Sequence, residues 1–571
     1  MNEPSPTAIP QSQARLPSWL IALSLSVLAS LALLLPSFWL GSASGHDFEF
    51  HVASWLDVAY QWKQGVLFPR WTAWTNFGFG EPRFIFYPPL SWILGAALSL
   101  VLPISWVPAA FILLSQTLAG MSAFFLLRRL TGNTPAYLGA AFYAANPYAL
   151  LVSYVRSDFA EQLACAIFPL LLLAALRLAG LLEKEKLRSS AVTLFAIVFA
   201  AVWLCNAPAG VIASYSMAFV FAWAALTQRS WRVTLRASIG LVLGFGLAGF
   251  YLLPAAYEQR WVNIGQALSS GLLPAQNFLF TRIADAEHTW FNWISSLCAL
   301  ALVLLAALTA LASRRFSNHT NLAKTSKPVW GGLLLLGSVA TLMMFRITLL
   351  LWNLLPKMRF VQFPWRWMCI LAVVCSCFLA AAVERRRGWL WVVLVAILSF
   401  PLGYFLSQNT WWDPDEMSTQ RAAITSNTGY EGVDEYDPLG DDHLDLPKHA
   451  PPAQILPEET DDLRGAPPNA KIQIETWETN NHKVLVESPA PARVALRLLN
   501  YPSWQVTVNG KPVTPEKPDD LDQMLVPVEA GRSEIQVRFV RTMDQTAGNA
   551  LSLFSLLLAA GLLASRKSLN T

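Results

Sequence analysis

Residues 293–312 read WISSLCALALVLLAALTALA, a run without a single charged side chain. A helix needs about 20 mostly apolar residues to cross the hydrocarbon core of a bilayer. Similar runs recur along the chain, so the sequence predicts a protein that crosses the membrane many times. The predicted spans are 18–37, 106–127, 135–151, 161–181, 189–205, 208–226, 237–256, 293–312, 329–347, 367–383, 389–407 and 548–565.

The overall composition agrees with a membrane location. Of the 571 residues 54% are hydrophobic and only 14% are charged, whereas an ordinary soluble domain carries roughly 25% charged residues. This composition excludes a disordered chain and a soluble nucleic-acid-binding protein, and no nucleic-acid partner is expected. The 24 tryptophans are typical of a chain that meets the interfaces of a lipid bilayer.

Basic clusters between the predicted spans set the orientation, because cytoplasmic loops of membrane proteins are enriched in Lys and Arg. If the N-terminus is cytoplasmic and the apolar run 84–102 does not cross, every cluster falls on the cytoplasmic side; if this run crosses, all fall outside. We therefore predict that 84–102 is re-entrant or interfacial, with crossing as the alternative. The predicted location is the cytoplasmic (inner) membrane. The clusters are Arg128-Arg129, Lys184/Lys186/Arg188, Arg229/Arg232/Arg236, Arg314/Arg315/Lys324/Lys327, Arg385-Arg386-Arg387 and Arg566-Lys567.

The predicted domains follow from these spans. A cytoplasmic tail (1–17) precedes a transmembrane domain (18–407) whose first outer loop is 38–105. An extracytoplasmic region (408–546) and a final helix with a basic cytoplasmic tail (547–571) follow.

The extracytoplasmic region holds about two thirds of the 37 acidic residues. Its first part, 408–469, is rich in Pro, Asp and Glu and is predicted to be irregular and solvated. From about 470 apolar and polar residues alternate, and Asn509-Gly510 is a strong hairpin signal. This pattern predicts a small β-sandwich, which can serve for packing, for covering a substrate or for binding a carbohydrate.

Candidate catalytic residues lie at the start of the first outer loop. Asp47 and His51 are four apart, so on a helix they share one face, whereas Glu49 points elsewhere. A carboxylate at this place can act as a general base or be an ordinary surface acid. His46, Asp47 and His51 can alternatively bind zinc, but a fourth ligand is unassigned.

A second group of candidates contains Arg156, Asp158 and Glu161. Ionisable residues at membrane depth are costly and usually line a functional cavity. An arginine can bind a phosphate through two hydrogen bonds, whereas the two acids can equally be N-terminal helix caps. Arg366 stands at a helix start, where a cation is unfavourable unless it meets an anion such as a lipid phosphate; its alternative role is a headgroup anchor.

Several separated motifs together resemble one family, the membrane proteins described as 6-pyruvoyl-tetrahydropterin synthase-related. That family resembles the C-type glycosyltransferases (GT-C), which use polyprenyl-phosphate sugars. The resemblance covers residues 18 to about 407. Its motifs are Gly45-His46-Asp47 with His51, Phe68-Pro69-Arg70-Trp71, Gly78-Phe79-Gly80, Phe86-Tyr87-Pro88-Pro89-Leu90, Tyr154-Val155-Arg156 with Glu161, and Gln362-Phe363-Pro364-Trp365-Arg366.

The resemblance implies roles for individual residues. GT-C enzymes place an essential carboxylate after the first span, where Asp47 stands, with Glu49 as the second choice. The segment Pro88-Pro89-Leu90 is expected beside the active-site cavity. A second outer acid corresponds to Asp158 or Glu161. The family commonly has a histidine where this chain has Asn206.

We therefore expect an α-helical multi-pass, GT-C-like membrane protein with about 12–13 membrane helices and a C-terminal extracytoplasmic β-sandwich. The favoured function is that of a glycosyltransferase, which moves a sugar from a polyprenyl-phosphate donor to a glycan, lipid or protein acceptor on the outer face. The alternatives are a non-catalytic transporter or lipid-handling protein and an envelope-assembly protein with a partner-binding outer domain. No metal ligands are assigned, and a divalent cation is left open. The expected catalytic residues are Asp47, Glu49 and His51, and the expected substrate-binding residues are Arg70, Tyr87, Arg156, Asp158, Glu161, Glu258, Gln362 and Arg366.

Overall fold

The structure is a computed structural model. It describes residues 16–182, 189–316, 327–383, 388–413, 415–439, 446–457, 469–516 and 523–565. The N-terminal tail up to residue 15 and the basic clusters within 183–188, 317–326, 384–387 and 566–571 lie outside the described residues.

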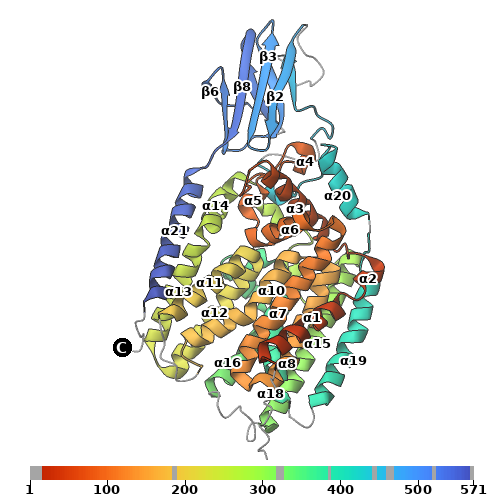
Figure 1. The fold of residues 1–571 in the computed structure, drawn as a ribbon, viewed down its shortest axis with the longest axis vertical. Coiled ribbons are helices and arrows are strands. Elements are labelled where there is room, and N and C mark those ends of the chain that lie inside the picture. Colours follow the sequence, from red (N-terminus) through yellow and green to blue (C-terminus); the bar gives the residue numbers. More distant parts are fainter. Residues whose placement is uncertain are drawn as a thin grey trace, which may run out of the picture.

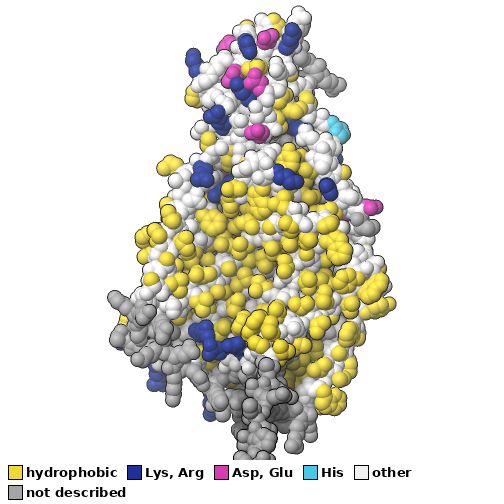
Figure 2. Space-filling model, in the orientation of Figure 1, with side chains coloured by type: hydrophobic (Ala, Val, Ile, Leu, Met, Phe, Trp, Pro, Cys, Tyr) yellow, Lys and Arg dark blue, Asp and Glu magenta, His cyan; other side chains and the backbone are white. Residues whose placement is uncertain are grey.

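Helices form the larger part of the molecule, and the β strands lie together at one end (Figure 1). Within the described residues, seven helical segments are long and apolar enough to cross a membrane. Figure 2 shows a broad hydrophobic surface on the visible face of this helical part, with charged side chains gathered above and below it. The seven segments are Ile104–Thr131 (containing α7), Phe159–Leu178 (α10), Ala207–Gln228 (α12), Ala286–Ser313 (in α15), Pro364–Ala382 (containing α18), Gly388–Gln408 (α19) and Met543–Ala564 (α21).

Two further predicted spans are sharply bent helix pairs, which raises the number of candidate spans to nine if each pair is one span. α13 (Trp231–Leu247) and Gly249–Trp261, which begins with α14 (Gly249–Glu258), meet at 75°. The bend lies where glycines allow close packing on α21, because a Cβ on Gly246 would be only 2.2 Å from the Ser555 hydroxyl. α16 (Lys327–Met343) and Arg346–Leu354, which ends with α17 (Leu349–Leu354), meet at 91°.

Several predicted spans are shorter than expected. α1 (Ser18–Leu33) and α11 (Ser190–Cys205) have 16 residues each. The predicted span 135–151 is interrupted: α8 (Asn133–Ala144) ends, and α9 (Pro147–Leu151) begins anew. The reason is local, because Asn146 caps α9 by accepting hydrogen bonds from the next turn.

The run 84–102 is divided between α5 (Arg83–Phe86) and α6 (Pro89–Val101). The 13 residues of α6 make a helix of about 20 Å, which is shorter than a hydrocarbon core of about 30 Å. This length favours the prediction that the run does not cross.

The core of the helical part centres on α18 (Met368–Ala382), in which every residue is buried. α18 packs against α15 (Ala286–Phe316), α8, α16 and α7 (Val107–Thr131). Small residues permit this close packing: a Cβ on Gly139 of α8 would lie 3.0 Å from the Ser376 carbonyl oxygen of α18. The short helix η9 (Pro364–Trp367) immediately precedes α18, so the residues of η9 are held at the edge of a rigid core.

The C-terminal strands form two antiparallel sheets of order β1-β4-β7 and β2-β3-β8-β5-β6. Most of their buried apolar residues belong to one hydrophobic cluster that both sheets share, whereas Leu456, Ala495 and Leu525 form a small separate one. The predicted β-sandwich is thus confirmed. Asn509 and Gly510 both have positive φ and join β5 to β6, as the hairpin signal predicts. The strands are β1 (Ala453–Pro457), β2 (Lys471–Glu478), β3 (Asn481–Ser488), β4 (Ala492–Leu499), β5 (Trp504–Val508), β6 (Lys511–Val513), β7 (Gln523–Val528) and β8 (Gly531–Phe539).

The expectation that 408–469 is irregular and solvated is wrong in its described part. This stretch contains the helix α20 (Glu416–Thr425), the short helix η10 (Asp434–Tyr436) and the strand β1. It packs on the first outer loop, where Glu81 accepts a hydrogen bond of 3.1 Å from the backbone of Val433. The first outer loop itself is built on the helix α3 (Phe48–Lys63) and the short helices α4 (Thr75–Gly78) and α5.

Candidate functional site

The start of α3 is docked on the turn that precedes α10. The backbone N–H of Gly45 donates to the Ser157 hydroxyl at 3.0 Å, and the backbone N–H of Asp47 donates to the carbonyl of Arg156 at 2.9 Å. No side chain fits at position 45, because a Cβ there would lie 2.4 Å from the Val155 carbonyl oxygen. The glycine therefore lets the two segments meet backbone to backbone, which fixes Asp47 beside Arg156.

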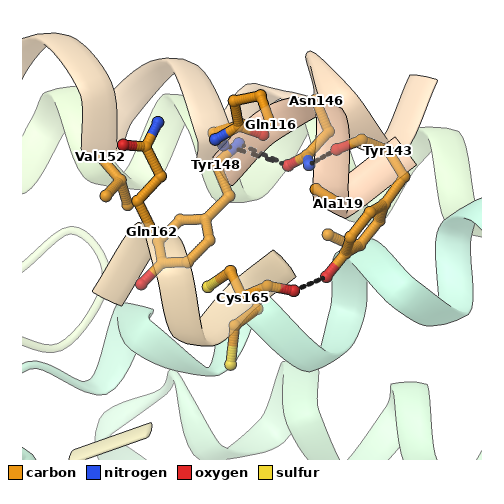
Figure 3. A pocket seen from close by; sticks show the side chains of 11 residues that line it. Gln116, Ala119, Tyr143, Asn146, Tyr148, Val152, Gln162 and Cys165 are labelled. Carbon is orange, nitrogen blue, oxygen red and sulfur yellow. Dashed lines mark hydrogen bonds between the residues drawn. The ribbon is translucent and has the colours of Figure 1, made fainter. Parts of the chain in front are cut away.

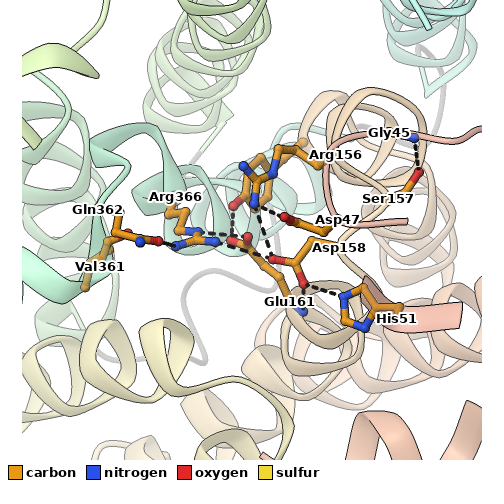
Figure 4. A network of polar contacts seen from close by, with 11 residues as sticks. Gly45, Asp47, His51, Arg156, Ser157, Asp158, Glu161, Val361, Gln362 and Arg366 are labelled. Carbon is orange, nitrogen blue, oxygen red and sulfur yellow. Dashed lines mark hydrogen bonds and ion pairs between the residues drawn. The ribbon is translucent and has the colours of Figure 1, made fainter. Parts of the chain in front are cut away.

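Charged side chains from three separate segments converge at this junction (Figure 4). Arg156 contacts the Asp47 carboxylate and lies 3.8 Å from the carboxylate of Asp158. Arg366 of η9 lies 3.4 Å from the same carboxylate and 3.1 Å from that of Glu161. Asp158 is thus shared by two guanidinium groups that lie more than 200 positions apart in the sequence.

His51 and Gln362 complete this charged cluster. One turn after Asp47, the His51 ring lies 3.5 Å from the Asp158 carboxylate, so Asp47 and His51 do share one face of α3. Arg366 donates to the carbonyl of Val361 at 2.9 Å and to the side chain of Gln362 at 3.4 Å. These contacts fix the direction of the guanidinium.

Ionisation of Asp158 depends on its partners. This side chain is only 3% exposed, and burial by itself disfavours its charged form. The neighbouring His51 ring and the positive charges of Arg366 and Arg156 outweigh burial, and they hold the pKa of the Asp158 carboxyl well below its ordinary value. Asp158 also caps α10 by accepting from the backbone of Glu161 at 2.9 Å. It therefore serves both as a cap and as a buried anion.

A small cavity lined by Tyr143, Asn146 and Tyr148 lies inside the helical core (Figure 3). Its polar groups satisfy one another: Tyr143 donates to the carbonyl of Cys165 at 2.7 Å, and Asn146 caps the helix that carries Tyr148. The Tyr148 hydroxyl in turn donates to the Glu161 carboxylate. Tyr148 therefore links this cavity to Glu161 of the charged cluster.

The charged cluster forms one wall of a large cavity of about 990 Å³. Asp47, Arg156, Asp158 and Arg366 reach its surface, whereas Glu161 and His51 are not among the residues that line it. The other walls combine apolar and aromatic side chains with polar and charged ones. The lining residues used below are Tyr87, Trp203, Asn206, Phe245, Leu252, Phe360, Gln362, Glu435 and Tyr436.

Three of the expected site residues lie outside this cluster. Glu49 contacts Gln420 of α20 on another side of α3. Glu258 accepts a hydrogen bond of 2.6 Å from Tyr501 of the β-sandwich, and Arg70 stacks on Phe68 at 5.2 Å. Tyr87, in contrast, lines the large cavity and contacts the His51 ring edge-on at 5.8 Å.

The sequence analysis missed several cavity residues, of which two lie in the outer region. Glu435 and Tyr436 belong to η10, in the acidic segment that was expected to be solvated. No local pattern marks them, because η10 is placed by long-range contacts such as the backbone bridge between Val262 and Pro438. Burial raises the pKa of Glu435 to about 7, so this carboxyl is partly protonated near neutral pH.

Asn206 occupies the place where the resemblance leads us to expect a histidine. It lines the cavity, and its side chain caps α12 (Ala207–Gln228) by accepting from Ala209 at 2.9 Å. A structural cap thus accounts for this residue, and its amide still reaches the cavity wall.

The alternative zinc site at His46, Asp47 and His51 does not assemble. The ring of His46 packs edge-on against Phe291 and Trp411, while His51 faces Asp158. Burial and the charge of Arg156 lower the pKa of His46 to about 4. Within the described residues no group of three or more His, Cys, Asp or Glu is arranged to hold a metal ion.

A family model matches more than half of the chain. It is that of the 6-pyruvoyl-tetrahydropterin synthase related domain, a membrane protein, and the match covers residues 84–409. The chain belongs to this family. The matched part of this 6-pyruvoyl-tetrahydropterin synthase-related membrane protein contains Arg156, Asp158 and Arg366, and it ends before the β-sandwich. No curated protein matches the sequence.

Three solved structures of the oligosaccharyltransferase of Archaeoglobus fulgidus are similar to this chain. The complex with an acceptor peptide is 17% identical, covers 70% of this chain and 55% of its own, and has a TM-score of 0.40. The complex with an inhibitory peptide and a dolichol-phosphate is 14% identical, covers 68% of this chain and 55% of its own, and has a TM-score of 0.39. The complex with zinc and sulfate is 15% identical, covers 70% of this chain and 53% of its own, and has a TM-score of 0.40. The chain thus spans about half the length of these proteins, and the values are too low to transfer a site or an activity.

Proposed function

We propose that this protein is a GT-C-type glycosyltransferase that moves a sugar from a polyprenyl-phosphate donor to an acceptor at the outer face of the cytoplasmic membrane. The observation that supports the proposal most is the joint position of Asp47, Arg156, Asp158 and Arg366 on one wall of a cavity of about 990 Å³. The acceptor is a glycan, lipid or protein. In this proposal the N-terminus is cytoplasmic and residues 408–546 are extracytoplasmic.

The two-sided character of the cavity suits an amphiphilic donor. Guanidinium groups on one wall are favourable for a phosphate, and the apolar side chains of Trp203, Phe245 and Leu252 are favourable for a hydrocarbon chain. Pockets of about 300–1,000 Å³ commonly hold small organic ligands. A lipid-linked donor also needs no nucleotide on the outer side of the membrane.

Arg156 is the first candidate for the phosphate ligand. A guanidinium has five N–H donors, and the buried Nε of Arg156 has no hydrogen-bond partner among the described residues. The guanidinium is held over Phe363 at 4.8 Å and Trp365 at 5.6 Å, so it is already oriented. Arg366 contributes a second positive charge to the same wall.

Asp47 is the proposed general base. Its side chain keeps 31% of its surface accessible, the largest share among the acids of the charged cluster, and it lines the cavity. It would take the proton of an acceptor hydroxyl or amine as that group attacks the anomeric carbon and the bond to the donor phosphate breaks. The leaving polyprenyl phosphate stays with Arg156 and Arg366. His51, which is buried behind Asp158, is a positioning residue in this scheme.

The test uses the full-length protein in lipid nanodiscs with radiolabelled polyprenyl-phosphate hexoses. We expect Asp47→Asn to reduce release of polyprenyl phosphate by about 10²-fold or more, the range expected for loss of a general base. Asp415→Asn, which changes an exposed acid of the outer region, is the matched control. Unchanged release by Asp47→Asn, at normal expression and helix content, would overturn the assignment of Asp47.

A further inference from the structure

A second cavity, of about 450 Å³, lies where the β-sandwich meets the first outer loop and α20. α3 connects it to the charged cluster: Asp47 stands at one end of this helix, and Tyr60 and Gln64 stand at the other. A helix of 16 residues is about 24 Å long. The second cavity is therefore separate from the cavity of Asp47, and nothing in the proposed reaction uses it.

Aromatic side chains from both parts of the molecule reach this second cavity. Trp477 lies near the end of β2, an edge strand, and is only half-buried. Tyr60 is 40% exposed and packs edge-on against Trp74 with ring centroids 4.3 Å apart. Each of the three rings lines the cavity. An accessible tryptophan in an acidic outer domain is an unusual use of a large apolar side chain unless something covers it.

Polar groups with unmet hydrogen-bonding capacity lie among these rings. His482 lines the cavity and is packed between Trp477 and Trp504, with ring centroids at 4.3 and 5.4 Å. Neither of its ring nitrogens has a hydrogen-bond partner among the described residues. Burial lowers the pKa of His482 to about 3, so its ring is neutral and offers one donor and one acceptor.

Arg497 adds a second unmet donor to the cavity wall. Its side chain is 6% exposed and donates through Nη1 to the carbonyls of Asn427 and Ala450 at 3.3 and 3.4 Å, whereas its Nε has no partner among the described residues. The cavity is also preformed. Thr479 donates to the Gln64 side chain at 2.9 Å, which fastens the β2–β3 hairpin to the end of α3.

This combination selects a chemical class of ligand. Flat aromatic faces favour the C–H face of a ring, while neutral donors and acceptors between them favour hydroxyl groups. An alkyl chain would leave the Nε of Arg497 and the ring nitrogens of His482 without partners, and a strongly charged ligand would meet both Arg497 and Glu478. We propose that this cavity, between the first outer loop and the β-sandwich, binds a neutral saccharide of one or two rings.

The test measures binding by isothermal titration calorimetry with the full-length protein in nanodiscs, in the absence of a lipid-linked donor. The probes are methyl glycosides of glucose, galactose, mannose and N-acetylglucosamine and their β1,4-linked disaccharides. We expect at least one probe to bind saturably with a Kd on the order of 1 mM. Because no turnover is measured, failure of the proposed sugar transfer would not affect this result.

Two variants locate the site, and one serves as a control. Trp477→Ala removes an aromatic face and should weaken binding at least about tenfold, that is by about 1.4 kcal/mol. Thr425→Trp adds bulk at an exposed position of the cavity wall without removing an aromatic contact, and it should weaken binding to a similar extent. Trp39→Ala, which removes a tryptophan that is 77% exposed and does not line this cavity, should bind normally. Absence of binding by every probe, or unchanged binding in both cavity variants, would overturn the proposal.

Discussion

Replacing Asp158 with asparagine tests whether the charged cluster is held together by a buried anion. Asparagine caps a helix about as well as aspartate, so the substitution removes the charge and keeps the cap on α10. Removing one partner of a buried ion pair typically costs about 3–5 kcal/mol, because the other charge stays buried. The cost here is at the lower end of this range, because each arginine retains another carboxylate partner. Arg366 still pairs with Glu161 at 3.1 Å, and Arg156 still pairs with Asp47. We expect a loss of about 3 kcal/mol in the free energy of unfolding.

The assay is reversible unfolding in mixed micelles with an increasing fraction of sodium dodecyl sulfate, followed by the helical circular dichroism signal. Asp158→Ala should lose about 1 kcal/mol more than Asp158→Asn, because it also removes the cap. Asp415→Asn, at the exposed N-cap of α20, should change stability by less than about 0.5 kcal/mol. A loss for Asp158→Asn no larger than that of Asp415→Asn would refute the reasoning.

The pH dependence gives an independent arm of the same experiment. Because the pKa of Asp158 is lower in the folded protein than in the unfolded chain, its stabilising effect is present above the unfolded value of about 3.9. This effect is lost as the pH falls below that value toward the folded pKa. The difference in stability between the wild-type protein and Asp158→Asn should therefore shrink as the pH is lowered below about 4. A difference that does not depend on pH would contradict the account.

Two further predictions concern the large cavity and the docking of α3. Because the pKa of Glu435 is about 7, its carboxyl gains a negative charge as the pH rises from about 6 to 8. The ionised Glu435 should weaken binding of polyprenyl phosphate to the nanodisc protein about tenfold over that range. The ratio of the Kd of the wild-type protein to that of Glu435→Gln should therefore rise with pH, and a ratio that does not change with pH would count against the prediction. Gly45→Ala should destabilise the protein by about 2 kcal/mol and reduce sugar transfer, because its Cβ would overlap the Val155 carbonyl. Gly265→Ala, which meets no atom within 4 Å, is its control, and equal stability of the two variants would exclude the clash.

Much of the fold is readable from local patterns. The strands β2, β3, β4, β5, β7 and β8 coincide with runs of alternating residues, since one face of each strand must be buried in the sandwich. The turn at Asn509-Gly510 follows from the residues that tolerate positive φ. The helical membrane part follows from uncharged apolar runs, because each run is long enough to need a lipid or protein environment.

The remaining elements could not be predicted because distant contacts create them. α20, η10 and β1 lie in a polar stretch without periodicity, and they are ordered by packing on the first outer loop and on β4. The bend between α13 and α14 depends on how closely α21 approaches Gly246, which the local sequence does not reveal. For the candidate site, the sequence placed Asp47 and His51 on one face of a helix. It could not show that Arg156, Asp158 and Arg366 would meet that face, or that Glu49, Arg70 and Glu258 would lie elsewhere.

The β-sandwich is attached to the helical part on both sides, by α19 before it and by α21 after it. A domain held at two points cannot drift away when one contact opens, and its local concentration at the docking surface stays high. Individually weak contacts, such as the Thr479–Gln64 hydrogen bond, are then sufficient to keep it seated. The two walls of the saccharide-sized cavity are thus kept together by covalent connections as well as by contacts.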